Sequence, residues 1–218
     1  MSTLPLSALF APSDEQAMWR VAMQGDAQAF AQLMRRLETP IQRLGARMTG
    51  DFQRGQDLAQ ETFARLFARR KEYMPSGKFS TYLWRIALNL CYDELRRIER
   101  RGELSLDSAE TEATAAWEAL GTAASAPDAL LLEEERAALV RDALLRIAEP
   151  YRTVVALRHY ENLKFREIAK ILDIPEGTVK SRMAEALTQL SRLLSPALKE
   201  KPNLCKTPTK KIEETMML

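Results

Sequence analysis

Residues 164–194 read KFREIAKILDIPEGTVKSRMAEALTQLSRLL. The first part places Phe165, Ile168 and Leu172 on one apolar face, at the spacing of an amphipathic helix. Pro175 ends this pattern because it has no amide hydrogen and a fixed φ. A second helical pattern follows, with apolar residues along one stripe: Val179, Met183, Ala186, Leu187, Leu190 and Leu194. The stretch predicts two helices joined by a tight turn.

The second of these helices begins with polar and cationic residues opposite its apolar stripe. They are Thr178, Lys180, Ser181 and Arg182. A short helix, a tight turn and a second helix with a cationic start form the arrangement that places a helix in the major groove of DNA. A helical hairpin whose charges are merely solvated is the alternative that this stretch alone leaves open.

The composition is that of a globular, helix-rich protein. The 218 residues are enough for one or two domains, each with a core. Hydrophobic residues make up 46% of the chain and charged residues 28%, which excludes a chain too polar to fold. Only 8 glycines, together with many Ala, Leu, Arg and Glu residues, favour helices. We therefore expect an all-α fold.

Several classes of function are disfavoured. The two cysteines form no CxxC pair and there is one histidine, which argues against a four-ligand zinc site and a disulfide framework. The N-terminus lacks a basic segment and is interrupted by Pro5 and Pro12, and no apolar run approaches about 18 residues. We find no clustered acid, base, nucleophile or metal ligands. We expect a cytoplasmic, non-enzymatic protein with no cofactor, metal, small-molecule substrate or membrane insertion.

Charge is distributed unevenly, although the net charge is only +2. Residues 26–101 hold 15 Lys and Arg against 9 Asp and Glu. Residues 102–135 hold 9 acidic and no basic residues, and residues 136–198 hold 11 basic against 7 acidic. Two basic blocks on either side of an acidic connector are typical of two modules that face a polyanion.

The first basic block predicts three helices. The first, over residues 29–48, contains Pro40, so we expect a kink or break near Thr39. The second spans about 55–71 and the third 79 to about 101, with a loop over 73–78 marked by proline and glycine. Tyr82 and Trp84 lie about 100° to either side of Leu83, so at least one should be exposed to stack on unpaired bases. Partial burial of both against a neighbouring helix remains the alternative.

Two sets of motifs resemble one known family. The first comprises QDLAQETF at 56–63, FSTYLWRIALNL at 79–90 and DELRR at 93–97, and it resembles region 2 of bacterial sigma factors of the extracytoplasmic function (ECF) group. The second comprises YRTVV at 151–155, HYENL at 159–163, EIA at 167–169 and GTVKSR at 177–182, and it resembles region 4 of the same group. Together they occur in the family's order and separation.

The resemblance implies specific roles in the first block. The second helix of region 2 docks on the clamp helices of the β′ subunit of core RNA polymerase, which points to Asp57, Gln60, Glu61 and Arg65. The following loop and third helix read the promoter −10 element as single-stranded bases and hold it open. The matching candidates are Tyr73, Lys78, Phe79, Tyr82, Trp84, Arg85 and Asn89, with Arg96 and Arg97 on the flanking backbone.

The resemblance also implies that region 4 docks on the polymerase β flap and inserts a helix into the −35 major groove. The candidates for DNA contact are Lys164, Glu176, Thr178, Lys180, Ser181, Arg182 and Glu185. Glu185 departs from the basic residues that many family members have after this motif. It either accepts a hydrogen bond from a cytosine amine or lies beside the DNA backbone and weakens non-specific binding.

The predicted organisation is two small helical domains joined by a flexible acidic linker. Residues 1–22 form an N-terminal extension, 23–101 the region 2 domain, 102–135 the linker, 136–196 the region 4 domain and 197–218 a tail without regular structure. Short helices are expected at 113–120, around Trp117, and at 212–218. The resemblance further implies control by an anti-sigma factor, with control by abundance or by the tail as alternatives.

The leading hypothesis is an alternative sigma factor that directs core RNA polymerase to promoter DNA and helps to melt it. The alternatives are a stand-alone helix-turn-helix regulator and a nucleic-acid-processing enzyme. The first basic block disfavours both, because a simple regulator needs no second module of this kind and an enzyme needs a catalytic cluster.

Overall fold

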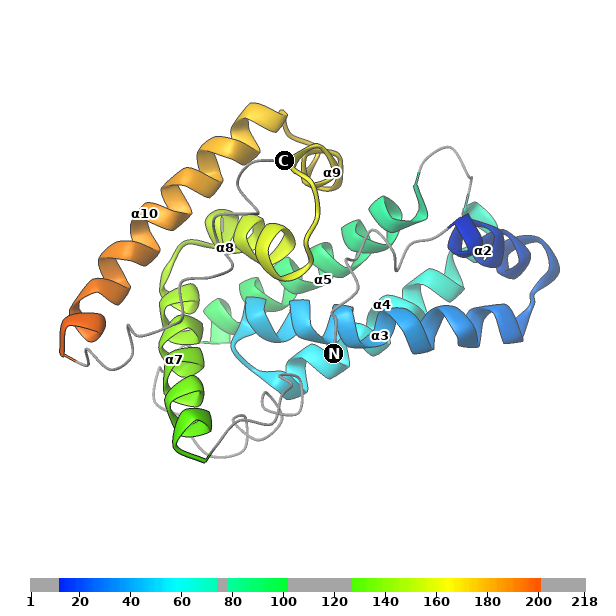
Figure 1. The fold of residues 1–218 in the computed structure, drawn as a ribbon. Helices are drawn as coiled ribbons and strands as arrows, with labels where there is room; N and C mark the ends of the chain where they lie inside the picture. The colour runs from blue at the N-terminus through cyan, green and yellow to red at the C-terminus, as the bar shows by residue number, and fades with distance from the viewer. Residues whose placement is uncertain (1–11, 74–77, 102–126, 201–218) are drawn as a thin grey trace.

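The computed structural model describes residues 12–73, 78–101 and 127–200, and all regular elements in these ranges are helices (Figure 1). The N-terminal group comprises α2 (Pro12–Gln24), α3 (Ala27–Thr49), α4 (Phe52–Ala68), the short 3₁₀ turn η1 (Arg70–Glu72) and α5 (Phe79–Arg101). The C-terminal group comprises α7 (Pro127–Arg146), α8 (Glu149–Val155), the π-helical turn η2 (Ala156–Tyr160), α9 (Phe165–Leu172) and α10 (Glu176–Glu200). The prediction of an all-α fold is confirmed for these residues.

Local capping sets the ends of the helix pair α3–α4. Asp26 caps α3 by accepting a hydrogen bond from the Ala29 amide, and Gly50 ends the helix in the left-handed region at φ 82°. Asp51 then caps α4 through the Arg54 amide at 3.1 Å. This cap explains why α4 begins three residues before the start that we expected at residue 55.

Two glycines allow α3 and α4 to cross in close contact. A Cβ atom at Gly45 would lie 2.9 Å from the Cα atom of Gly55. A Cβ atom at Gly55 would lie 2.5 Å from the Gln42 carbonyl oxygen. Backbone therefore packs directly on backbone at this crossing, which no larger residue permits.

The core of the N-terminal group lies between α3, α4 and α5. Leu33, Leu37, Phe63, Leu83 and Trp84 are almost completely buried there. The helix α5 has the predicted bounds. Burial of one such side chain contributes about 1.5–3 kcal/mol, so these five side chains are a large part of what holds the three helices together.

The N-terminal extension is partly integrated into this core. Residues 12–22 belong to α2, whose Met18 and Val21 are completely buried against the core that α3 and α5 form. The buried carboxylate Asp14 is paired with Arg36 of α3. Burial of an unpaired carboxylate is costly, so this pairing accounts for a charged group at a buried position.

Two features of the helix interiors differ from what the sequence suggested: α3 has no break at Pro40, and Leu187 is exposed. The helix α3 continues through Pro40 to Thr49 without a break, because a single missing amide is outweighed by an apolar face buried on both sides of it. Leu187 was placed on the apolar stripe of the second helix, yet in α10 it is 53% exposed. The buried positions of that helix are Val179, Ala186 and Leu190, and Leu187 lies about 100° from Ala186 around the axis.

The C-terminal group has its own smaller core. Ala143 and Leu144 of α7, Val155 of α8, and Ala186 and Leu190 of α10 form this cluster. The helix α7 starts at Pro127, inside the range predicted as linker, and α10 extends to Glu200, into the range predicted as tail. The expected helices at 113–120 and 212–218, and Trp117, lie outside the described residues.

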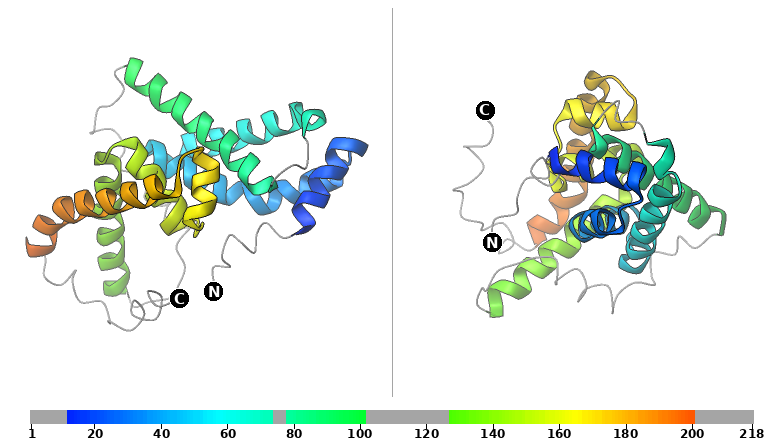
Figure 2. Two further views of the ribbon diagram at one scale, coloured as in Figure 1. Left: turned by 90° about the horizontal axis from the view of Figure 1, so that it is seen from above. Right: turned by 90° about the vertical axis from the view of Figure 1, so that its right-hand side faces the viewer.

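The two groups pack against each other. Figures 1 and 2 show α9 beside α5, and α7 crosses near the end of α3. Val154, Leu157 and Ile168 of the C-terminal group belong to the same apolar cluster as Leu37 and Leu83 of the N-terminal group. The two groups therefore share the larger apolar cluster, and the smaller cluster of the C-terminal group lies beside it.

Candidate nucleic-acid interface

The helix-turn-helix has the geometry that the sequence predicts. Glu167 closes the start of α9 by accepting a hydrogen bond from the Lys164 amide at 3.1 Å. Asp173 then takes a left-handed conformation at φ 56°, and the Pro175 carbonyl accepts the first amides of α10 from Thr178 and Val179. Both helices are anchored by fully buried residues, which leaves the polar start of α10 outside the core.

The start of α10 presents the candidates for −35 recognition. Lys180, Ser181 and Glu185 are exposed, and Lys164 is exposed at the start of α9. Glu176 and Thr178 are half-buried. Internal contacts fix several of these side chains: Lys180 pairs with Glu176 at 2.8 Å, the Ser181 hydroxyl donates to the Thr178 carbonyl, and the Gln189 amide donates to Glu185.

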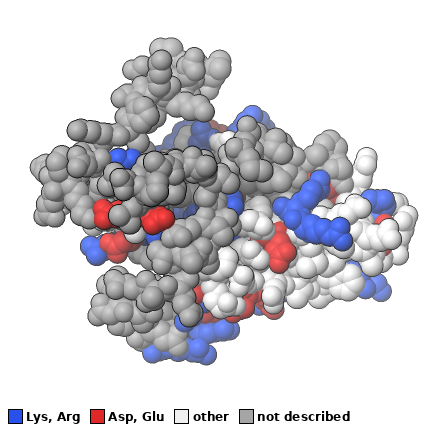
Figure 3. Space-filling view, turned by 60° about the horizontal axis from the view of Figure 1, so that its bottom comes forward, with Lys and Arg blue, Asp and Glu red and all other residues white. Residues whose placement is uncertain are grey.

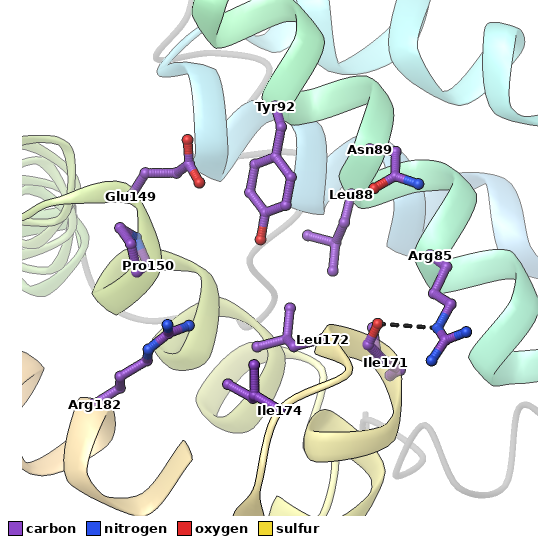
Figure 4. A pocket seen from close by; sticks show the side chains of 10 residues that line it. All are labelled: Arg85, Leu88, Asn89, Tyr92, Glu149, Pro150, Ile171, Leu172, Ile174 and Arg182. Atoms are coloured by element: carbon purple, nitrogen blue, oxygen red, sulfur yellow. Dashed lines mark hydrogen bonds between the residues drawn. The ribbon is translucent and has the colours of Figure 1, made fainter. Parts of the chain in front are cut away.

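Arg182 is placed differently from its neighbours. It extends from α10 toward a pocket of about 330 Å³ between α5, α8, α9 and α10 (Figure 4). Across the pocket lie Arg85, Asn89 and Tyr92 of α5. Glu149 completes the polar lining, and partial burial raises the pKa of its carboxyl despite the lowering effect of Arg152 and Arg96. Candidates from both halves of the sequence thus meet at one place.

The aromatic candidates of the first block lie mostly in the core. Trp84 and Phe79 are completely buried, and Tyr73 is 5% exposed, so these three present no ring to a base in this conformation. Tyr82 is half-buried, and its ring lies 5.7 Å from that of Tyr73. Burial raises the pKa of both tyrosines. Tyr82 is therefore the one predicted stacking residue of this set with partial exposure.

The polar candidates on α5 and directly before it are accessible, but two of them, Arg85 and Lys78, already bind the C-terminal group. The Arg85 guanidinium donates to the carbonyls of Lys170 at 2.6 Å and Ile171 at 3.2 Å. Lys78 pairs with Glu167 at 3.0 Å. Burial alone would raise the pKa of Glu167, but hydrogen bonds from the Lys164 amide and from Lys78 lower it below its usual range.

The remaining candidates on α5 lie further along the helix. Asn89 is exposed at the rim of the pocket. Arg96 and Arg97 are exposed near the C-terminal end of α5 and pair with Asp93 and Glu94 one turn earlier. These pairs are exposed on at least one side, so they hold the arginines only weakly.

The predicted polymerase-binding residues share one exposed surface. Asp57, Gln60, Glu61 and Arg65 all lie on the solvent-facing side of α4, at spacings that align along one side of a helix. The Glu61 carboxylate and the Arg65 guanidinium form a pair at 2.8 Å. The opposite side of α4 packs on α3 and α5, so this surface is separate from the pocket.

Sequence reasoning missed the residues that join the two groups. Arg152 donates to the carbonyls of Met48, Leu145 and Ile147. Arg47 of α3 pairs with Glu161 at 3.1 Å in a nearly buried site. Arg152 and Glu161 both lie within motifs that carry the family resemblance, but nothing in the local sequence indicates partners about one hundred residues away.

Charges of both signs are mixed on the face of the molecule that Figure 3 shows. On the face in Figure 3, Lys and Arg occur in separate groups with Asp and Glu between them. Among the described residues, no three or more His, Cys, Asp or Glu side chains gather as metal ligands do. None of the helices described is both long and apolar enough to span a membrane.

Comparison with known proteins identifies the two groups. Residues 33–101 match the family described as Sigma-70 region 2, and residues 137–190 match Sigma-70, region 4. The chain belongs to the ECF group of the sigma-70 family. It is 32% identical to the ECF RNA polymerase sigma factor SigW of Bacillus subtilis over 171 residues, which are 78% of this chain and 91% of that protein. It is 31% identical to the RNA polymerase sigma-H factor of Pseudomonas aeruginosa, over 86% of this chain and 96% of that protein.

Solved structures share the fold of this sigma factor. CnrH, solved in complex with the cytosolic domain of CnrY, aligns with a TM-score of 0.63 at 22% identity and covers 85% of this chain and 99% of its own. The sigma factor RpoE of Bartonella quintana, solved with the anti-sigma factor NepR, aligns with a TM-score of 0.57 at 19% identity. The alignment covers 78% of this chain and 98% of that chain. Region 2 thus corresponds to most of α3–α5, and region 4 to α8–α10 with much of α7.

Proposed function

We propose that this sigma factor binds core RNA polymerase, reads the −35 and −10 elements of promoters and promotes DNA melting. The observation that carries the proposal is the presence of both regions on one chain. Their order and separation agree with those of SigW and the sigma-H factor, because the alignments cover 91% and 96% of those two proteins. A regulator that acts without polymerase needs only the helix-turn-helix.

Polymerase binding is assigned to the exposed side of α4. Asp57, Gln60, Glu61 and Arg65 form a polar surface with both charge signs, which suits docking on another helical surface. The proposed contact is the clamp helices of the β′ subunit, and region 4 contacts the β flap. None of the four residues belongs to the buried core of the fold, so this surface is free to contact a partner.

Recognition of the −35 element is assigned to the start of α10. Lys180, Ser181 and Arg182 lie where a recognition helix enters the major groove, with Lys164 beside the DNA backbone. Phosphate contacts fix the position of the helix and base contacts select the sequence. Glu185 is exposed one turn further along, where it either accepts a hydrogen bond from a cytosine amine or lies beside the DNA backbone and weakens non-specific binding.

Recognition of the −10 element is assigned to the first half of α5 and the residues before it. Lys78, Arg85 and Asn89 supply polar contacts, and Tyr82 supplies a ring for stacking on an unpaired base. Arg96 and Arg97 hold the flanking backbone. The buried Tyr73, Phe79 and Trp84 support this surface from beneath by holding α5 in place.

The proposal includes the cellular setting. The protein carries out no reaction itself, since polymerisation belongs to the core subunits, and it acts in the cytoplasm, where polymerase and promoter DNA are located. Control by an anti-sigma factor is supported by the neighbouring folds, one solved with the anti-sigma factor NepR and one with the cytosolic domain of CnrY. Residues 23–101 and 136–196 remain the proposed domains, with α2 attached to the first.

Reconstitution with core polymerase tests the proposal. The purified protein added to core polymerase should initiate transcription on bacterial genomic DNA far above the level of core alone. Asp57→Arg should fold normally, because Asp57 is exposed, yet lose binding to core. A protein that binds duplex DNA but not core would support the stand-alone regulator instead.

A further inference from the structure

Trp19 and Met23 form an exposed apolar ridge on α2. Their side chains are 45% and 55% exposed, and they lie one helical turn apart on the side of the helix that faces away from the core. The core side of the same helix carries Met18 and Val21, which are completely buried. The packing of α2 is therefore complete without Trp19, and an indole left in contact with water indicates a surface that binds another molecule.

Trp19 lies on the side of α2 that faces the surface assigned to the −10 element. The helix packs on α3, on η1 and on α5 (Figure 1). Burial raises the pKa of the Tyr73 hydroxyl and the charge of Glu15 raises it further, which places Glu15 beside that ring. Glu15 precedes Trp19 by one turn on the same side of α2. The centre of the Tyr73 ring is in turn 5.7 Å from that of Tyr82. One continuous surface therefore connects Trp19 with the half-buried ring of Tyr82.

The residues around these rings are mainly basic. Residues 69–72 read RRKE, and the side chains of Arg69, Lys71 and Lys78 are exposed. Burial raises the pKa of the Tyr82 hydroxyl and the charge of Arg69 opposes this rise, which places Arg69 near that hydroxyl. Exposed cations beside exposed rings attract the phosphates of a nucleic-acid chain.

This combination of rings and cations fits unpaired bases better than a duplex or a protein. Every base has a flat face that stacks on an aromatic ring, and in a duplex the neighbouring base pairs cover that face. Arg20, next to Trp19, is exposed and lies 3.9 Å from Asp26, so it is held only weakly and can contact a phosphate. An apolar protein surface would remove water from the basic side chains without offering them a charge.

We propose that Trp19 stacks on an unpaired base beside the −10 element, so that α2 and α5 hold neighbouring parts of the same melted strand. This inference rests on the proposed function and adds a binding residue from outside the segment that matches Sigma-70 region 2, which begins at residue 33. Tyr73 is buried between the two helices and supports the surface without stacking. A second exposed ring beside Tyr82 holds a further base out of the duplex, which favours the open complex over the closed one.

Photocrosslinking tests the contact directly in the complete holoenzyme. A promoter that the protein selects with core polymerase would carry 5-iododeoxyuridine at successive positions of the melted strand beside the −10 element. Irradiation links this base to an aromatic ring stacked on it. We expect one position to give a peptide in which Trp19 is linked to the nucleotide, detected by mass spectrometry in open complexes and absent from closed complexes kept at low temperature. Adducts on other residues, with none on Trp19 at any position, would overturn the proposal.

Substitutions test what the contact contributes to melting. Trp19→Ala should lower the ratio of open to closed complexes at least about fivefold, the factor that the loss of one stack between a base and an aromatic ring produces. Trp19→Phe keeps a ring and should restore most of this ratio. Met23→Ala is the matched control, because Met23 is exposed on the same helix but has no ring, and it should leave the ratio unchanged. Permanganate reactivity reports open complexes, and gel shifts report closed ones.

Binding to core polymerase separates this proposal from a protein contact of the same ridge. Trp19→Ala should bind core as tightly as the wild-type protein and keep its urea midpoint, because the side chain is only partly buried. A loss of core binding equal to the loss of open complexes would overturn the proposal and assign Trp19 to the polymerase interface. Wild-type protein that fails to initiate with core would refute the proposed function, and this inference with it. If the wild-type protein initiates and Trp19→Ala melts promoters equally well, this inference alone fails.

Discussion

At the scale of single residues, chemical type alone does not tell which candidate side chains are exposed. Lys180 and Arg182 are two positions apart on α10, yet the first is exposed and paired within its helix, while the second extends into the pocket. Trp84 and Tyr82 were equivalent candidates from sequence, and burial separates them. Such differences depend on how each helix is rotated about its axis against its neighbours. Sequence spacing predicts this rotation only to within about one residue, which is about 100° around the helix.

Arg182→Ala should weaken binding of the polymerase holoenzyme to a −35 duplex. Loss of a bidentate base contact costs about 1–3 kcal/mol, a factor of about 5–150. Arg192→Ala is the control, because Arg192 is exposed on the same helix, about three turns away from the recognition end. Fluorescence anisotropy with labelled promoter duplex should show the loss for the first variant alone. Equal losses would indicate a general electrostatic effect.

Tyr82→Ala and Trp84→Ala should have different effects. Removal of the completely buried Trp84 side chain should lower the free energy of unfolding by about 3–5 kcal/mol. Removal of the half-buried Tyr82 side chain should change stability less and should reduce permanganate-detected open complexes more than closed-complex binding. Urea unfolding and promoter footprinting together make the comparison. Similar stability losses, with no melting defect for Tyr82→Ala, would contradict its assigned role.

Glu161 should make stability depend on pH between about 5 and 7. Burial raises the pKa of this carboxyl to about 7, and burial outweighs the opposing charges of Arg47 and Arg43. The pKa of this carboxyl in the folded form lies above the usual value of 4.5, so the folded form binds the proton more tightly than the unfolded form does. The free energy of unfolding therefore falls as the pH rises toward about 7 and the proton is lost. The free energy of unfolding decreases by at most about 3 kcal/mol, and this decrease is complete above the pKa of the folded form.

Glu161→Gln removes the titrating group at this site. Urea unfolding of both proteins at pH 5, 6, 7 and 8 should show a stability difference that changes with pH below 7 and is constant above it. The Tyr160 hydroxyl and Arg47 face the same site but remain protonated over this range. A difference independent of pH would show that the carboxyl keeps an ordinary pKa.

At the scale of elements, the ends of the helices could be predicted where a capping or turn residue was recognised in the sequence. Pro175 marked the turn of the helix-turn-helix, and the second helix, α10, begins directly after it at Glu176. The start of α4 was placed three residues too late because Asp51 was not recognised as a cap. The break expected at Pro40 is absent because tertiary packing of α3 overrides a local preference.

The crossing of α3 and α4 provides a prediction at this scale. Gly55→Ala should lower the free energy of unfolding by about 1–3 kcal/mol or more, because the new Cβ atom would lie 2.5 Å from the Gln42 carbonyl oxygen. Gly177→Ala is the matched control, since no atom lies within 4 Å of its Cβ position. The control should be neutral or slightly stabilising, by up to about 1 kcal/mol. Urea unfolding measures both, and equal effects would contradict the close crossing.

At the scale of the whole molecule, the sequence predicted two modules and a common ligand but not their contact. Each feature that the sequence revealed lies within one continuous segment of the chain. This holds for the basic blocks, the acidic connector and the individual motifs, so each can be recognised from the sequence alone. The joining contacts connect Arg47 with Glu161 and Arg85 with Ile171, and no periodicity or local motif relates such distant positions. The packing of the two regions against each other is therefore information that only the structure supplies.

The most direct test of the central claim is to map transcription start sites made in vitro. Purified protein and core polymerase would be incubated with fragmented bacterial genomic DNA, and the 5′ ends of the transcripts sequenced. Starts are expected at a limited set of positions that share two sequence elements, centred near −35 and −10. Starts that are no more frequent or specific than those of core alone would contradict the account.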